Sequence, residues 1–148
     1  MSIGTRGKWA EGKFRAWAKL QSEAKLDFAF LRYPDARAGS RVVAPSDFEV
    51  LYAGQHYNIE IKEVDHSFRL PHKNFSEDKI ARMRKWELAG GASWVVIYFA
   101  PAKIWRVETV GWFMHKVGGS WDMSGITGTD FNQAMKEIFH VHTQTSAT

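Results

Sequence analysis

Two carboxylates and a lysine stand at a spacing that suits a metal-dependent phosphodiesterase site. Pro45-Ser46-Asp47 is followed by Glu60-Ile61-Lys62, which gives the pattern D-x12-E-x-K. Carboxylate oxygens are good ligands for Mg²⁺ and Mn²⁺, and such ions assist phosphodiester hydrolysis. The pattern therefore predicts two acidic side chains converging on one hard cation, with an ammonium group alongside.

Two segments in which apolar and polar residues alternate must position these groups. Tyr57, Ile59 and Ile61 alternate with polar residues, as in a half-buried strand, so Glu60 and Lys62 are expected on one face. Asp47 begins a second run, and residues 53–55 predict a turn between the two. An antiparallel hairpin would carry Asp47 back beside Glu60. The same spacing also fits a hairpin whose polar face is only solvated, and spacing alone favours neither interpretation.

Length and composition bound the class of protein. The 148 residues suit a single domain (1–148), with flexible ends at 1–7 and 143–148, and 45% hydrophobic residues supply a core. Cysteine is absent, which excludes disulfides, zinc–thiolate sites and thiol nucleophiles. No apolar run approaches the roughly 20 residues that a membrane span needs, and we expect no membrane partner and a cytoplasmic location.

The charge is unevenly distributed along the chain. The net charge is +4, yet residues 1–41 hold nine basic and four acidic side chains, whereas residues 42–148 hold eleven and twelve. A basic segment beside a cation-binding site suits a polyanionic substrate, although a solubilising surface would give the same net charge. Zinc-protease spacings of histidine, G-x-S-x-G and the phosphate-binding G-x-x-x-x-G-K-[ST] are all absent from the sequence, so triad hydrolases and nucleotide-binding enzymes are disfavoured.

The remaining pattern predicts helices and strands in the order α-β-β-β-α-β-β-α. Ser76 is expected to cap one helix and Gly90-Gly91 to end it. This order describes an α/β fold with a mixed central β-sheet flanked by helices. The predicted elements are a helix at 8–24, a strand at 26–33, a connector at 34–45, hairpin strands at about 46–53 and 56–64, an irregular segment at 65–75, a helix at 76–89, strands at 93–99 and 103–107, a small helix at 110–114 and a final helix at 130–142.

Several motifs, taken together, resemble those of the PD-(D/E)xK nuclease superfamily and, within it, RecU-type Holliday junction resolvases. The resemblance covers about residues 6–114 and implies a restriction-endonuclease-like fold. The chain departs from the family pattern at Ile61, where a smaller residue is more usual, at Asp78-Lys79, where His-Gln is usual, and in its short connector 34–45. The matching segments are Arg6-Gly7 with Glu11, residues 45–47 with 60–63, residues 67–70 and 73–75, and the run from helix 76–89 to strand 94–99.

The chemistry of metal-assisted phosphodiester cleavage assigns roles to the residues of the acidic motif, and the resemblance adds Glu11. Asp47 and Glu60 would bind Mg²⁺ (or Mn²⁺) with the backbone carbonyl of Ile61, and Lys62 would orient the attacking water or stabilise the transition state. Glu11 would approach from the first helix to hold a water or a second metal ion. Basic residues would contact DNA phosphates, although a solvated surface position suits each of them as well. These basic residues are Arg37, Arg41, Arg69, Lys73 and Lys79.

The implied activity is a structure-selective endodeoxyribonuclease that resolves four-way DNA junctions by paired symmetrical nicks. Two equivalent strands must be cut, which implies a two-fold homodimer. A bacterial or phage-infected cell is the expected setting, and the short chain suits a phage origin. Two alternatives stay open: a restriction-like or repair nuclease acting on linear or other branched DNA, and a non-catalytic junction-binding protein.

Overall fold

A five-stranded mixed sheet forms the centre of the protein, in the order β1-β2-β3-β5-β6. The computed structural model describes residues 3–34, 43–116 and 118–140, with side chains from Lys8 onward. The predicted α/β architecture, a mixed central sheet flanked by helices, is confirmed. The elements are α1 (Ile3–Ala24), β1 (Phe28–Arg32), β2 (Phe48–Tyr52), β3 (Gln55–Val64), β4 (Arg69–Pro71), η1 (His72–Asn74), α2 (Glu77–Leu88), β5 (Ala92–Phe99), β6 (Ile104–Thr109), η2 (Val110–Met114), β7 (Ser120–Asp122) and α3 (Phe131–Phe139).

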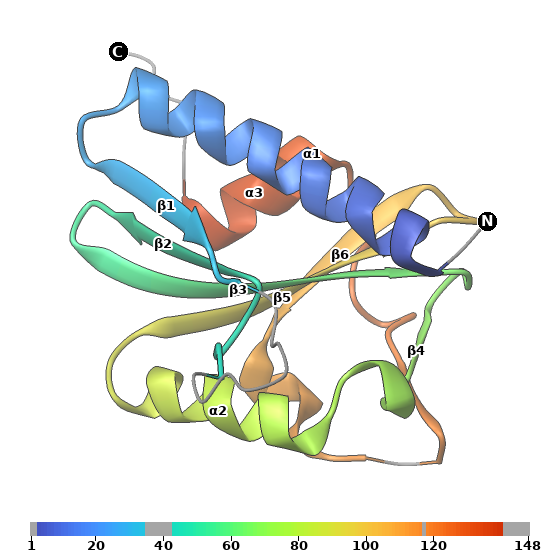
Figure 1. Cartoon of the computed structure of the whole chain (residues 1–148). Helices are drawn as coiled ribbons and strands as arrows, with labels where there is room; N and C mark the ends of the chain where they lie inside the picture. Colours follow the sequence, from blue (N-terminus) through green and yellow to red (C-terminus); the bar gives the residue numbers. More distant parts are fainter. Residues whose placement is uncertain (1–2, 35–42, 117, 141–148) are drawn as a thin grey trace.

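Helices cover both faces of the sheet. Figure 1 shows α1 and α3 on one face and α2 on the other. The first layer encloses an aromatic core around Phe14, Phe48 and Phe139. The second layer buries Met83 of α2 against β5. Burial of this apolar surface supplies the main driving force for assembling the three layers.

Strand β3 is central and carries the acidic motif. It pairs antiparallel with β2 and parallel with β5. Ile59 and Ile61 enter the core beneath α1, so the intervening Glu60 and the following Lys62 point to the α2 face. The predicted alternation of apolar and polar residues is therefore present along this strand. It places the apolar side chains in the core and the polar ones on the opposite face.

Helix α2 begins and ends where the sequence predicted. The hydroxyl of Ser76 accepts a hydrogen bond from the backbone N–H of Lys79 at 3.2 Å, as an N-cap does. Gly90 follows the helix with φ of +111°, a conformation that favours glycine. The start of α2 is thus fixed, which matters because Lys79 lies in its first turn.

Some predicted boundaries were wrong. Helix α1 starts at Ile3, five residues before the predicted start, and Leu26 is exposed outside β1. The segment 65–75, expected to be irregular, contains β4 and η1. Strand β4 pairs with β7, a strand that is absent from the predicted elements. Three-residue strands carry too short a pattern to reveal their pairing in the sequence.

The predicted connector 34–45, with Arg37 and Arg41, lies mostly outside the described residues, as do residues 143–148. Helix α3 ends at Phe139, where His140 adopts a left-handed conformation with φ of +52°, rather than continuing to 142. Across the described ranges, no helix combines the length and the apolar character needed to cross a membrane.

Candidate active site

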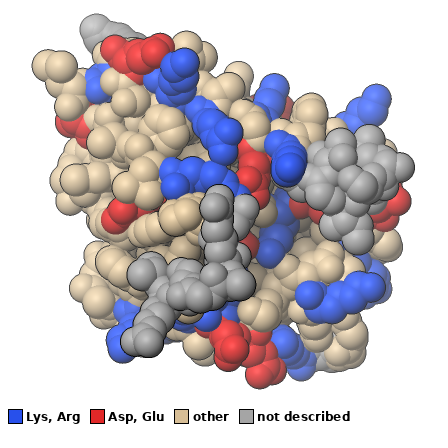
Figure 2. Space-filling model, viewed as in Figure 1, with Lys and Arg blue, Asp and Glu red and all other residues tan. Residues whose placement is uncertain are grey.

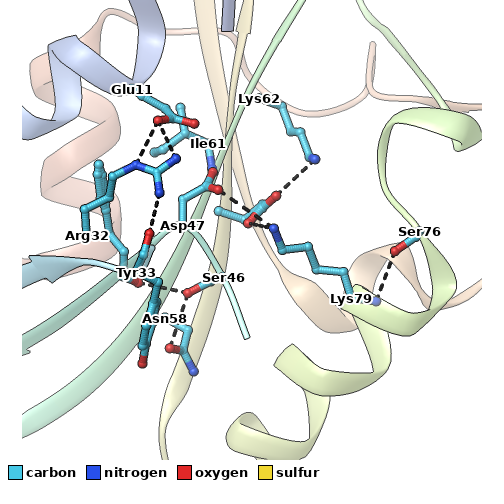
Figure 3. A network of polar contacts seen from close by, with 12 residues as sticks. Glu11, Arg32, Tyr33, Ser46, Asp47, Asn58, Ile61, Lys62, Ser76 and Lys79 are labelled. Carbon is cyan, nitrogen blue, oxygen red and sulfur yellow. Dashed lines mark hydrogen bonds and ion pairs between the residues drawn. The ribbon is translucent and has the colours of Figure 1, made fainter. Parts of the chain in front are cut away.

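The hairpin of β2 and β3 brings the two predicted acids together. Phe48 pairs with Ile59, so Asp47, one residue before β2, reaches the position beside Glu60. Oδ2 of Asp47 accepts a hydrogen bond from the backbone N–H of Ile61 at 2.8 Å (Figure 3). The register predicted from sequence is thereby realised in three dimensions.

Glu60 lies between two ammonium groups. Its side chain is 2% exposed, with Lys62 Nζ 3.0 Å from Oε2 and Lys79 Nζ 3.0 Å from Oε1. Lys79 Nζ also lies 3.8 Å from Oδ1 of Asp47. Asp47, Glu60, Lys62 and Lys79 thus form one cluster with two acidic and two basic groups, which we call the carboxylate cluster.

Burial strongly affects the Asp47 carboxyl group. Its pKa is raised from 3.8 to about 7, first by loss of hydration and second by the nearby charge of Glu60. The ammonium of Lys79 and the N–H of Ile61 oppose this shift by favouring the ionised form. A carboxylate held in this way gains stability from any further cation placed against it.

The carboxylate cluster fits a divalent ion. Oε1 of Glu60 is buried and receives no hydrogen bond, although the Lys79 ammonium is near it. The N–H of Ile61 points toward Asp47, and the N–H and C=O of one strand residue point to the same side, so the Ile61 carbonyl faces that side too. Among the described residues, no group of three or more His, Cys, Asp or Glu could hold a metal. Two carboxylates are nevertheless enough for Mg²⁺, which usually keeps several waters.

A buried polar pair supports the cluster from beside β3. Ser46 Oγ donates a hydrogen bond to the backbone oxygen of Phe48 at 2.9 Å and lies 3.3 Å from Asn58 Oδ1. Ser46 and Asn58 are both almost fully buried. The pair joins the residue before Asp47 to the residue two before Glu60, which limits relative movement of the two acids (Figure 3).

Glu11 occupies a different place from the other predicted acids. Its Oε1 accepts hydrogen bonds from Arg32 Nε at 3.1 Å and Arg32 Nη2 at 2.9 Å. The guanidinium also donates to the backbone oxygen of Tyr33, the residue after β1. Glu11 still lies close enough for its charge to raise the pKa of Asp47. Helix α1 therefore brings Glu11 to the edge of the cluster, where Arg32 holds it.

Strand β3 is also tied to helix α1 beyond the motif. Oε1 of Glu63 accepts a hydrogen bond from the backbone N–H of Ala10 at 3.1 Å. Glu63 immediately follows Lys62, and Ala10 immediately precedes Glu11. This contact fixes the helix at the position where Glu11 approaches the carboxylate cluster.

A groove of about 740 Å³ adjoins the carboxylate cluster at Lys62, and residues of β3, β4 and β7 line it. Its lining includes the basic residues Lys62, Arg69 and Lys73 and the acidic residues Glu63 and Asp65. Arg69 Nη2 lies 3.5 Å from Asp122 Oδ2, a contact between two half-exposed side chains that leaves the guanidinium accessible. Figure 2 shows Lys and Arg side chains gathered around acidic ones near the middle of one face of the molecule.

The structure thus brings together Asp47, Glu60, Lys62 and Lys79, and places Arg69 and Lys73 along the adjoining groove. Sequence reasoning missed the support from Ser46 and Asn58. Asn58 was detectable because it shares the period-two face of Glu60. The position of Lys79 against both acids had no local signal, since it depends on how α2 packs under the sheet.

The mixed sheet with helices on both faces is a restriction-endonuclease-like fold. A solved structure with this fold is Hjc from Archaeoglobus fulgidus, described as a Holliday junction resolvase from an archaeal hyperthermophile. The TM-score is 0.53 at 20% sequence identity, and the match covers 81% of this chain and 97% of Hjc. No protein-family model matches the sequence, and no curated protein does. At this identity the similarity establishes the fold.

Proposed function

We propose that this protein is a metal-dependent, structure-selective endodeoxyribonuclease that resolves four-way DNA junctions. The observation that carries the proposal is the convergence of Asp47, Glu60 and Lys62 beside a groove that Lys62 lines, in a fold shared with a junction resolvase. Mg²⁺ or Mn²⁺ is the proposed cofactor, because both acids offer hard oxygen ligands.

Each residue then has a distinct role. Asp47, Glu60 and the backbone carbonyl of Ile61 would hold the divalent ion, which when bound would acidify a water and neutralise charge on the phosphate. Lys62 would orient the attacking water or stabilise the negative charge that develops on the phosphoryl oxygens. Glu11, held by Arg32, would accept a hydrogen bond from a water at the edge of the cluster.

The groove supports a DNA substrate. Lys62, Arg69 and Lys73 supply three positive charges to its lining, beside the acids Glu63 and Asp65, and would contact phosphates of the bound strand. Contacts of this kind bind phosphates irrespective of base, so selectivity would come from the branched shape of the DNA. Arg37 and Arg41 would add phosphate contacts from the connector.

A two-fold homodimer completes the proposal, because a four-way junction presents two equivalent strands to cut. Trp9 and Leu20 of α1 are 50% and 64% exposed, which provides apolar surface for a partner copy. Within this proposal, the order of the sequence motifs favours a RecU-type enzyme of bacterial or phage origin, acting in the cytoplasm.

The decisive experiment incubates the protein with an immobile four-way junction labelled on each strand in turn, with and without Mg²⁺. We expect paired nicks at symmetrical positions on two opposite strands, only when Mg²⁺ is present. A duplex with the same arm sequences is the control and should stay intact.

Two other outcomes of this experiment would contradict the proposal and indicate an alternative function. Equal cutting of junction and duplex would indicate a restriction-like or repair nuclease. Tight junction binding with no cutting in either Mg²⁺ or Mn²⁺ would indicate a non-catalytic junction-binding protein.

A further inference from the structure

We propose that Lys79 is a built-in cation that occupies the metal position in the metal-free protein and leaves it when a divalent ion binds. Once displaced, its ammonium is free to contact a phosphate of the bound strand. This inference rests on the proposed function, because it assumes that Asp47 and Glu60 are metal ligands. It assigns Lys79 a role beyond a general phosphate contact.

The first support is the pair of oxygens that Lys79 contacts. Its Nζ lies 3.0 Å from Glu60 Oε1 and 3.8 Å from Asp47 Oδ1, which belong to different strands. Lys62 approaches the other oxygen of Glu60, and the N–H of Ile61 occupies the other oxygen of Asp47. Lys79 therefore faces the two carboxylate oxygens that have no other described polar contact.

The second support is that a metal ion and the Lys79 ammonium cannot occupy the same position at once. Mg²⁺ binds carboxylate oxygens at about 2.0–2.1 Å and keeps waters around it. Such an ion, held by Oδ1 of Asp47 and Oε1 of Glu60, would occupy the space in which the Lys79 ammonium now sits. The cluster already balances two acidic groups with two basic ones, so a divalent ion would also add repulsion toward Lys79. Metal and ammonium must therefore compete.

The third support is the placement of Lys79 on its helix. A lysine in the first turn of a helix opposes the helix dipole, so this position does not serve the stability of α2. The backbone N–H of Lys79 is held by Ser76 Oγ, and Ile80 and Met83 fix the helix against the sheet. Its side chain is 24% exposed. The flexible side chain can therefore swing toward solvent while the backbone stays in place.

The test is a titration of metal-free protein with Mn²⁺ by calorimetry, without DNA, which compares Lys79→Met with the wild type. We expect the variant to bind Mn²⁺ about tenfold more tightly, because its ligands no longer carry a competing cation. Lys85→Met removes an exposed lysine from the same helix and should leave the affinity unchanged. An unchanged or weaker affinity in Lys79→Met would overturn the inference.

A second measurement tests the same competition without relying on affinity. In EDTA, Lys79→Met should unfold at a lower urea concentration than the wild type, because the two acids then face each other without their cation. Saturating Mn²⁺ should abolish this difference. A deficit that persists unchanged in Mn²⁺ would contradict a place-holding role and indicate ordinary packing.

The displaced state is tested by junction binding. With Ca²⁺ at the site, Lys79→Met should bind a four-way junction at least threefold more weakly than the wild type, and in EDTA equally well. Equal binding in Ca²⁺ would overturn the phosphate contact. If the wild type itself does not bind Mn²⁺, the proposed function is overturned too. If the wild type binds Mn²⁺ and Lys79→Met binds it with the same affinity, only this inference is overturned.

Discussion

The carboxylate of Asp47 accepts a hydrogen bond of 2.8 Å from the backbone N–H of Ile61, the residue between Glu60 and Lys62. One oxygen of Asp47 is thus tied to the strand that carries the other two functional groups. The second oxygen lies 3.8 Å from the ammonium of Lys79, which also contacts Glu60. The hydrogen bond from Ile61 sets the orientation of the acid in the metal-free protein, which is the pre-organisation that the proposed catalytic role requires.

Asp47→Asn should abolish cleavage while preserving the structure. Asparagine keeps an oxygen that can accept from Ile61 but removes a charged metal ligand, so we expect a loss of more than about 10³-fold in cutting rate. Junction binding measured by fluorescence anisotropy in EDTA should change less than about twofold. Asp78→Asn, an exposed acid of α2, provides the matched control. A normal cutting rate in Asp47→Asn would refute the assignment.

The raised pKa of Asp47 predicts how stability depends on pH. Since this pKa is about 7 in the folded protein and 3.8 ordinarily, the folded state binds more protons between these values. The free energy of unfolding of the metal-free protein should therefore decrease as pH rises from about 4 to 7, with a contribution from Asp47 of up to roughly 1.4 kcal/mol per pH unit, and then level. Urea unfolding in EDTA across this range measures the slope.

The matched comparison is Asp47→Asn, which should show a shallower slope and should be more stable than the wild type above pH 7. In the same range, the affinity of the wild type for Mn²⁺ should increase with pH, because the ion must displace a proton from Asp47. An affinity for Mn²⁺ that is independent of pH from 5.5 to 7.5 would argue against Asp47 as a ligand.

Lys62→Met should separate catalysis from metal binding. The ammonium of Lys62 contacts Oε2 of Glu60 and lies 5.2 Å from the centre of the Phe75 ring, over which the methionine side chain can still pack. We expect cutting to fall by about 10²- to 10⁴-fold with little change in Mn²⁺ affinity. Single-turnover cleavage and calorimetry measure the two quantities. Equal losses in both would indicate that Lys62 acts through the metal ligands.

Glu11→Gln tests whether the acid on α1 takes part. Glutamine retains the shape of Glu11 but weakens its two hydrogen bonds from Arg32. If Glu11 positions a water, the cutting rate should fall by about tenfold and Mn²⁺ affinity should be nearly unchanged. Glu23→Gln, on the same helix, is the control. Full activity in Glu11→Gln would leave Glu11 with a structural role only.

Arg69→Ala and Lys73→Ala should weaken junction binding through phosphate contacts. Each change should lower the slope of log affinity against log salt concentration by about 1, in proportion to the counterions released. Arg84→Ala, which changes a residue of α2 that pairs with Glu87 and does not line the groove, should not change the slope. Binding that is insensitive to both substitutions would exclude the groove as the DNA path.

Much of the site was predictable because the relevant signals are local. The alternation of β3 placed Glu60 and Lys62 on one face, and the turn before Gln55 placed Asp47 opposite Glu60. The cap at Ser76 was also readable, since its capping bond spans only three residues.

What the sequence did not reveal depends on contacts between distant elements. Arg32 ends β1 but holds Glu11, 21 residues away, and Lys79 reaches Asp47 only because α2 packs under the sheet. The pairing of β4 with β7 joins segments about 50 residues apart, each three residues long. The hydrophobic periodicity of a sequence carries no information on which distant elements come into contact.

The alternation of β3 has a consequence for how this protein can vary. Removing or adding one residue between Gln55 and Glu60 would reverse the two faces, sending the acid into the aromatic layer and the isoleucines toward the groove. Insertions and deletions should therefore be tolerated in the surface turns. Within this strand they should destroy the site. Homologues would be expected to differ freely in loop size while keeping this ten-residue segment free of gaps.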